Sequence, residues 1–167
     1  VIGIGEVPDV MKQAILAAED ERFYQHGGVD YVSIARAALA NLASGTQQGA
    51  GTITMQVARN FFLTREKTVT RKLREVLLAW KIEANLTKDE ILELYVNQIF
   101  LGRSAYGVQS ASRAYVTKDV VQLSLPEAAF LAILPKAPSN YDPTRHAERA
   151  LDRRNWVLGE MHDNGYI

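Results

Sequence analysis

The sequence contains no cysteine, which removes disulfide bonds and thiolate metal sites from consideration. It also has no surplus of charge, because 19 Lys and Arg residues balance 19 Asp and Glu residues. A general nucleic-acid binder needs a basic surplus for its phosphate contacts, so no nucleic acid is expected as a partner. No apolar run approaches the roughly 18 residues that span a bilayer. Since the chain opens at Val1 without the basic start and apolar run of a signal peptide, we expect a domain of a longer protein.

Strict alternation of polar and apolar residues is missing too, so the sequence predicts no strand. The 167 residues suit one compact domain, and the 47% of apolar residues can supply its core. Apolar residues recur at helical spacing, and Asp30, Thr87 and Ser124 are suitable N-caps. We expect one mainly helical domain over residues 1–167. A loop is expected over 45–51 and extended chain over 135–143. The expected helices cover 8–19, 30–45, 52–62, 68–85, a segment from 87 onward, 124–134 and 146–163.

An acidic cluster closes the first predicted helix. Glu19 follows the apolar run 14–18 and precedes Asp20, while Phe23 and His26 come just after. Partial desolvation makes a carboxylate a better base near neutral pH, so Glu19 is a candidate general base. From composition alone, a solvated acidic helix end is the more common explanation. No second histidine lies at metal-binding spacing from His26, so a structural role is its simpler interpretation.

A basic stretch surrounds the start of the fourth predicted helix. Its local positive potential favours an anionic partner, and arginine forks suit phosphate oxygens. A solvated face, or one in contact with lipid headgroups, is the alternative. The stretch consists of Arg59, Arg65, Lys67, Arg71, Lys72 and Arg74.

Glu75 shares one helix face with Arg71 and Lys72, which precede it by four and three residues. An ordinary intrahelical ion pair is the modest interpretation. Neighbouring cations favour the charged carboxylate, which makes Glu75 a poor general acid. A glycoside hydrolase needs such an acid, whereas a diphosphate leaving group needs only cations for its developing charge. The pattern therefore favours a diphosphate-linked donor over hydrolysis.

A wide apolar face covers the second predicted helix, and Phe61, Phe62 and Leu63 lie just before the basic residues. Apolar surface beside basic residues is typical of a protein that rests on an anionic bilayer. Burial in the core explains the same pattern equally well.

Five ordered sequence segments together resemble the signatures of the bacterial cell-wall glycosyltransferases, the class A penicillin-binding proteins and their monofunctional relatives. The resemblance implies a lysozyme-like helical fold with a larger lobe and a smaller, apolar, membrane-facing lobe. The five segments are Glu19–Asp30, Gly49–Gln56 with Arg59 and Asn60, Arg71-Lys72 with Glu75, Ile91–Asn97, and Ala128–Pro138 with Tyr141 and Pro143.

The family's reaction is the polymerisation of lipid II, an undecaprenyl diphosphate-linked disaccharide-pentapeptide, into β-1,4-linked glycan with inversion. By resemblance, Glu19 is the general base for the acceptor 4-hydroxyl. Glu75 lies on the donor side near the diphosphate, directly or through a divalent cation (Mg or Mn), although the sequence itself requires no cofactor. The residues expected to hold the diphosphate are Arg59, Lys67, Arg71 and Lys72, and those expected to line or brace the cleft are Asp20, Phe23, His26, Thr52, Gln56, Glu93 and Asn97.

The resemblance also implies partners outside this chain. They are the growing glycan strand, the membrane surface, a transpeptidase domain in the same parent protein and phosphoglycolipid inhibitors of the moenomycin type. The expected location is the outer, periplasmic face of the bacterial cytoplasmic membrane, with the anchor in a segment beyond this chain.

The second signature departs from its commonest form at Gly51, Met55 and Arg59, where Ser, Gln and Lys are usual. Arg59 keeps the charge, whereas Gly51 removes a hydroxyl and loosens the backbone. Two alternatives stay open at this stage: a lysozyme-like enzyme that cleaves peptidoglycan, and a non-catalytic module that binds lipid II.

Overall fold

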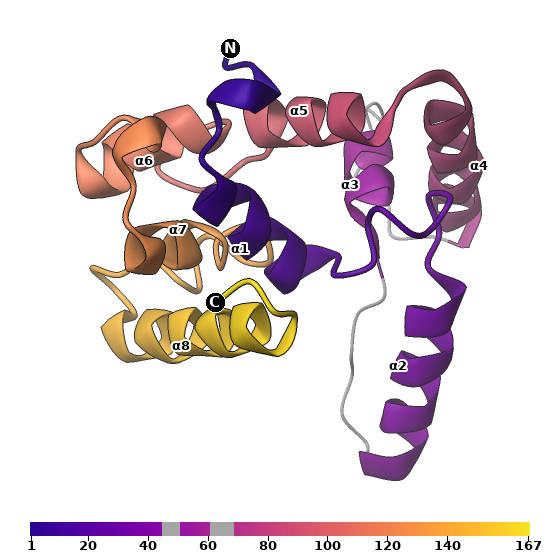
Figure 1. Ribbon diagram of the computed structural model, residues 1–167. Coiled ribbons are helices and arrows are strands. Elements are labelled where there is room, and N and C mark those ends of the chain that lie inside the picture. The colour runs from indigo at the N-terminus through magenta and orange to yellow at the C-terminus, as the bar shows by residue number, and fades with distance from the viewer. Residues whose placement is uncertain (45–50, 61–68) are drawn as a thin grey trace. The chain divides into compact units, whose positions relative to one another are not determined.

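The computed structural model describes residues 1–44, 51–60 and 69–167 (Figure 1). These residues are mainly helical, as predicted, and within them the only β-type pairing is an isolated bridge between Phe100 and Tyr106. No helix of the described ranges combines the length and apolarity that crossing a bilayer requires. The elements are η1 (Ile4–Glu6), α1 (Asp9–Glu19), α2 (Tyr31–Ser44), α3 (Ile53–Arg59), α4 (Val69–Asn85), α5 (Lys88–Gln98), α6 (Val108–Val116), η2 (Val120–Gln122), α7 (Leu125–Leu131) and α8 (Ala147–Asp163).

The helix starts predicted from the caps Asp30, Thr87 and Ser124 are confirmed. Each of these side chains makes a capping hydrogen bond with a backbone N–H three residues later. Asp30 accepts a hydrogen bond from the Ser33 backbone N–H at 3.1 Å, at the start of α2. The Thr87 hydroxyl accepts from the Glu90 N–H at 3.1 Å, while the Glu90 carboxylate accepts from the Thr87 N–H at 3.0 Å, which opens α5. The equivalent box of Ser124 and Glu127 opens α7. Each device satisfies backbone donors that the first helical turn leaves unpaired.

Four expectations about helix extent and connections were wrong. Helix α7 ends at Leu131 instead of residue 134, and residues 132–134 form a turn. Helix α3 ends at Arg59 instead of residue 62, and residues 61 and 62 lie outside the described ranges. Helix α6 was not predicted, since its N-cap is Gly107 in a left-handed conformation (φ 86°) with no side-chain cap. Residues 135–143 form successive turns instead of extended chain. The loop expected over 45–51 lies outside the described ranges except for its last residue.

The chain divides into two compact units, and the larger contains residues 1–21 and 92–167. Within it, α1 packs against α7 and α8, and α7 packs against α6. Met11, Ile15 and Met161 are among its fully buried side chains. The apolar faces of these helices therefore share one core.

The smaller unit contains residues 22–91, and its main helix contact is between α3 and α4. Val29, Met55 and Ala79 form a buried cluster, with Val76 packed against it. The expected larger and smaller lobes thus have counterparts in the two units. The membrane-facing character of the smaller one stays a prediction.

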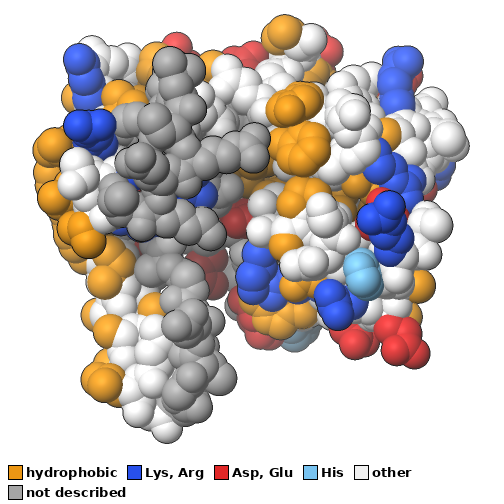
Figure 2. All heavy atoms as spheres, turned by 180° about the vertical axis from the view of Figure 1, so that it is seen from behind, with side chains coloured by type: hydrophobic (Ala, Val, Ile, Leu, Met, Phe, Trp, Pro, Cys, Tyr) orange, Lys and Arg blue, Asp and Glu red, His pale blue; other side chains and the backbone are white. Residues whose placement is uncertain are grey.

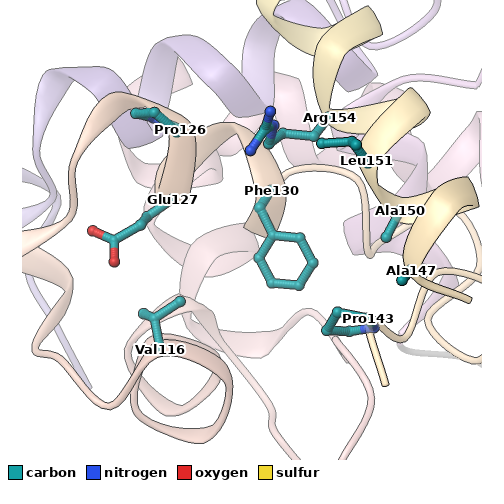
Figure 3. Close-up of a pocket in the computed structure, with 9 residues that line it drawn as sticks. All are labelled: Val116, Pro126, Glu127, Phe130, Pro143, Ala147, Ala150, Leu151 and Arg154. Carbon is teal, nitrogen blue, oxygen red and sulfur yellow. The ribbon is translucent and has the colours of Figure 1, made fainter. Parts of the chain in front are cut away.

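An apolar pocket of about 280 Å³ opens in the larger unit, with Phe130 at its centre and Arg154 at its edge (Figure 3). None of the predicted site residues lines it. Its walls are Val116, Pro126, Glu127, Phe130, Pro143, Ala147, Ala150, Leu151 and Arg154.

Candidate active site

Glu75 is fully buried, with 0% of its side chain exposed, and three cations surround it. Arg59, at the end of α3, places Nε 3.1 Å from Oε1, and Arg71 places Nε 3.2 Å from the same oxygen. Lys72 Nζ lies 3.6 Å from Oε2. The predicted pairing of Glu75 with Arg71 and Lys72 is confirmed, and Arg59 joins it from a second helix. A buried carboxylate without such partners would be strongly destabilising.

The three cations outnumber the single carboxylate, so this group, which we call the Glu75 cluster, carries an excess of positive charge. The Arg59 and Lys72 side chains are 44% and 55% exposed, whereas Arg71 is 16% exposed. An anion from solvent can therefore reach two of the cations without touching the buried carboxylate. Guanidinium and ammonium donors of this kind bind phosphate oxygens well. Lys67, also predicted to hold the diphosphate, lies outside the described residues.

The first signature folds onto the second within the smaller unit. Phe23 and His26 are both buried, and His26 Nδ1 accepts a hydrogen bond from the Gly28 N–H at 3.0 Å. The Thr52 hydroxyl donates to the Gly28 carbonyl at 2.7 Å and accepts from the Met55 N–H at 3.1 Å. With both capacities of its hydroxyl used, Thr52 braces the site. Gln56, one turn further along α3, is half-buried.

Glu19 and Asp20 close α1 in the larger unit, with Glu19 half-buried and Asp20 buried. Tyr95 of α5 is 1% exposed, and burial raises the pKa of its phenol well above the ordinary value. The negative charges of Glu19 and Asp20 raise this pKa further. The phenol therefore stays protonated at neutral pH and is a hydrogen-bond donor in the electrostatic neighbourhood of both carboxylates.

Tyr95 was not among the predicted site residues. Its partners lie 75 and 76 positions earlier in the chain, and no local pattern reports such a pairing. The signal that could have found it is its place inside the fourth signature, between Glu93 and Asn97.

Asn97 ties α5 to the N-terminal segment of the larger unit. Its Nδ2 donates to the carbonyls of Ile2 and Glu93, both at 2.8 Å, and its Oδ1 accepts from the Ile2 N–H at 2.7 Å. Three bonds to the backbone make Asn97 a brace for the segment that precedes α1. Glu93 is half-buried on the same helix.

No group of three His, Asp or Glu side chains that could hold a metal ion occurs among the described residues. At Glu75, the one candidate ligand, both carboxylate oxygens face cations within 3.6 Å. A divalent cation bound there would meet strong repulsion from the same three side chains. The residues present thus fit an anion better than a metal.

Comparison with known proteins identifies the family to which the chain belongs. The transglycosylase family model matches residues 1–162. Penicillin-binding protein 1A of Neisseria lactamica is 57% identical over 165 residues, which cover 98% of this chain and 21% of that protein. A putative transglycosylase of Cupriavidus necator is 54% identical over 166 residues, covering 99% of this chain and 72% of that protein.

A crystal structure of penicillin-binding protein 1A from Haemophilus influenzae is also similar, with a TM-score of 0.47 and 36% sequence identity. The match covers 69% of this chain and 14% of that one.

These matches define the class of protein: the domain is an enzyme, a glycosyltransferase. More particularly, the chain belongs to the transglycosylase family. The resemblance to penicillin-binding proteins expected from the five signatures is confirmed by relatives named penicillin-binding protein 1A, at 57% identity. The chain spans about a fifth of the length of those relatives, so those relatives contain further regions.

Proposed function

We propose that this domain polymerises lipid II into β-1,4-linked glycan, with inversion at the anomeric carbon and release of undecaprenyl diphosphate. The observation that carries the proposal is the Glu75 cluster, which offers exposed cations beside a carboxylate that they already neutralise. A diphosphate leaving group needs this arrangement, because its departure requires charge stabilisation and no proton. The transglycosylase family and the penicillin-binding protein relatives support the same reaction.

In the proposed step, Glu19 takes the proton from the 4-hydroxyl of the acceptor sugar. The acceptor oxygen forms a bond to the anomeric carbon of the growing chain, and the bond from that carbon to the diphosphate oxygen breaks with its electron pair on the diphosphate. The half-buried position of Glu19 supports this role, because partial desolvation favours a carboxylate as a base. Tyr95, which stays protonated, would hold this carboxylate in place.

On the donor side, Arg59, Arg71 and Lys72 would hold the departing diphosphate, with Lys67 as a further predicted contact. The excess of positive charge in the cluster supports this assignment. Because the cations already compensate Glu75, the step needs no metal at that carboxylate. Glu75 would then keep the three cations in place instead of exchanging a proton with the substrate.

The smaller unit would rest on the outer face of the bacterial cytoplasmic membrane. Hydrophobic side chains are exposed over α2 and α4 (Figure 2), whereas burial in the core was the alternative for the α2 face. Exposed apolar surface next to basic residues supports contact with an anionic bilayer. The anchor and a transpeptidase domain would belong to other parts of the parent protein. The exposed residues are Tyr31, Val32, Ile34, Leu39 and Leu42 of α2, and Val69, Leu73, Leu77 and Trp80 of α4.

The test is incubation of the purified domain with labelled lipid II, with and without a phosphoglycolipid of the moenomycin type. We expect glycan polymer, and no polymer when the inhibitor is present. Release of muropeptides from sacculi would instead identify a cleaving enzyme. Binding of lipid II without product, over a range of metals and detergents, would identify a binding module.

A further inference from the structure

Lys88, the first residue of α5, places its ammonium group among three different side chains of the smaller unit. Its Nζ lies 2.6 Å from Glu83 Oε1 and 3.5 Å from His26 Nδ1. The same atom lies 4.5 Å from the centre of the Phe23 ring. A cation in the first turn of a helix is repelled by the positive end of the helix dipole, so its position needs a compensating interaction. Glu83, whose side chain is 12% exposed, supplies that interaction.

Glu83 connects three helices through one oxygen. It belongs to α4, and its Oε1 accepts from Lys88 of α5 and, at 2.8 Å, from the hydroxyl of Thr54 in α3. Thr54 is fully buried. The ammonium of Lys88 is thus held at a defined place next to the imidazole of His26.

Gly28 contacts the same ring nitrogen of this imidazole. Its backbone has φ 103°, and a Cβ there would lie 3.0 Å from Glu83 Cγ and 3.2 Å from the Ala79 carbonyl oxygen. The loop therefore packs against α4 without space for a side chain. In this position the Gly28 N–H donates to His26 Nδ1 at 3.0 Å.

Two donors consequently face the same ring nitrogen of His26. A nitrogen that accepts a hydrogen bond carries a lone pair, so the proton of the neutral imidazole is on Nε2. The ammonium has donors only, so it too faces Nδ1 as a donor. Both neighbours thus favour one tautomer.

We propose that Lys88 is a positioning residue that, anchored by Glu83, holds His26 as the Nε2–H tautomer and fixes its ring beside Phe23. The inference about the tautomer stands on these contacts alone. Its consequence for turnover rests on the proposed function, because His26 is one of the predicted cleft residues. In this role Lys88 itself does not touch substrate.

The test is ¹⁵N NMR of the histidine-labelled domain at neutral pH, with His26 assigned by a His26→Gln variant. In the unsubstituted domain we expect His26 Nδ1 without a proton and Nε2 with one. Lys88→Met should produce a mixture of tautomers and about a tenfold loss of kcat in lipid II polymerisation, with KM changed by less than about twofold, as expected for the loss of one hydrogen bond's net stabilisation. Lys88→Arg keeps a cation within reach of Glu83, so it should keep the tautomer and most of the activity.

Lys12→Met is the matched control, since Lys12 belongs to the larger unit, is similarly shielded (25% exposed) and pairs with Asp9 on α1. It should change neither readout. Circular dichroism establishes that each variant is folded, and if Lys88→Met is not, Lys88→Gln takes its place. An unchanged tautomer in the folded variant that lacks the cation, or a mixture in Lys88→Arg, would overturn the proposal. A parent domain with the expected tautomer but no polymerase activity would overturn the proposed function and leave the role of Lys88 intact.

Discussion

The two glutamates predicted to be catalytic have opposite surroundings, and each lies in its own unit. Glu75 of the smaller unit is fully buried and in contact with three cations. Glu19 of the larger unit is half-buried, with Asp20 and the protonated phenol of Tyr95 as its electrostatic neighbours. Two identical side chains are thereby suited to different tasks, one to compensating cations and the other to accepting a proton. The comparison predicts that substitution of Glu19 affects turnover, whereas substitution of Glu75 affects stability as well.

Glu19→Gln should give the largest effect on activity. The amide keeps the shape of the side chain but cannot take the acceptor proton, and a general base contributes about 10²–10⁴-fold to a rate. Polymerisation of labelled lipid II should fall by that factor, while the urea midpoint stays within error of the parent. An undiminished rate would show that another group is the base, and Glu19 and Glu75 would then no longer differ in the way proposed.

Glu75→Gln should lower the free energy of unfolding by about 3 kcal/mol, the lower end of the range for breaking a buried ion pair. The lower end applies because Arg59 and Lys72 both reach solvent and can be partly hydrated. Urea denaturation measures the change. As a control, Glu148→Gln, at the exposed start of α8, should cost less than about 0.5 kcal/mol. Equal stability of the two variants would contradict the structural role of Glu75.

Tyr95→Phe should lower kcat by about tenfold with little change in KM, because it removes the phenol that we propose holds the Glu19 carboxylate through one hydrogen bond. The ring stays packed in the core, and only the hydroxyl that feels the charges of Glu19 and Asp20 is lost. Steady-state kinetics on lipid II measures the split. A change confined to KM would indicate that the phenol acts on substrate binding instead of on the base.

The smallest effect concerns an ion pair of the larger unit that contrasts with the buried Glu75 cluster. Arg103 donates two hydrogen bonds of 3.0 Å to Asp142, and these bonds are the main reason that the pKa of Asp142 falls from 3.8 to about 2. Because the folded-state pKa is lowered, the stabilisation is present above about pH 4 and is lost as the pH falls towards 2.

Asp142→Asn should therefore cost about 1 kcal/mol at neutral pH, the scale of a solvent-accessible pair, and nothing near pH 2. Thermal unfolding of both proteins across this range measures the difference. A cost that does not change with pH would assign the effect to packing instead of charge.

The sequence predicted those parts of the structure that depend on near neighbours. The caps at Thr87 and Ser124 and the pairing of Glu75 with Lys72 all join residues three or four positions apart, so helical geometry alone brings them together. Contacts between distant segments were not predicted. Arg59 reaches Glu75 from another helix, and the charge of Glu19 acts on Tyr95 only after the larger unit has folded.

Helix α6 shows a different reason for failure. It begins after Gly107, whose conformation substitutes for a side-chain cap, and Gln109 and Ser112 interrupt the apolar pattern of its sequence. Both polar residues serve tertiary contacts: Gln109 binds Asp119 and Val120, and the Ser112 hydroxyl donates to the Lys118 carbonyl. The polarity of Gln109 and Ser112 therefore reflects their hydrogen bonds to neighbours in space. A prediction from apolar periodicity counts the same polar residues as evidence against a helix.

The sequence does not distinguish Gly27 from Gly28, but the two differ in the structure because the loop approaches α4 closely at Gly28 alone. Gly27 has open space around the place of a Cβ, so larger residues fit there. At Gly28 even a methyl group would be forced against the backbone of α4, in a conformation that L-residues rarely adopt. Of this pair of adjacent glycines, only the second is therefore an obligatory choice.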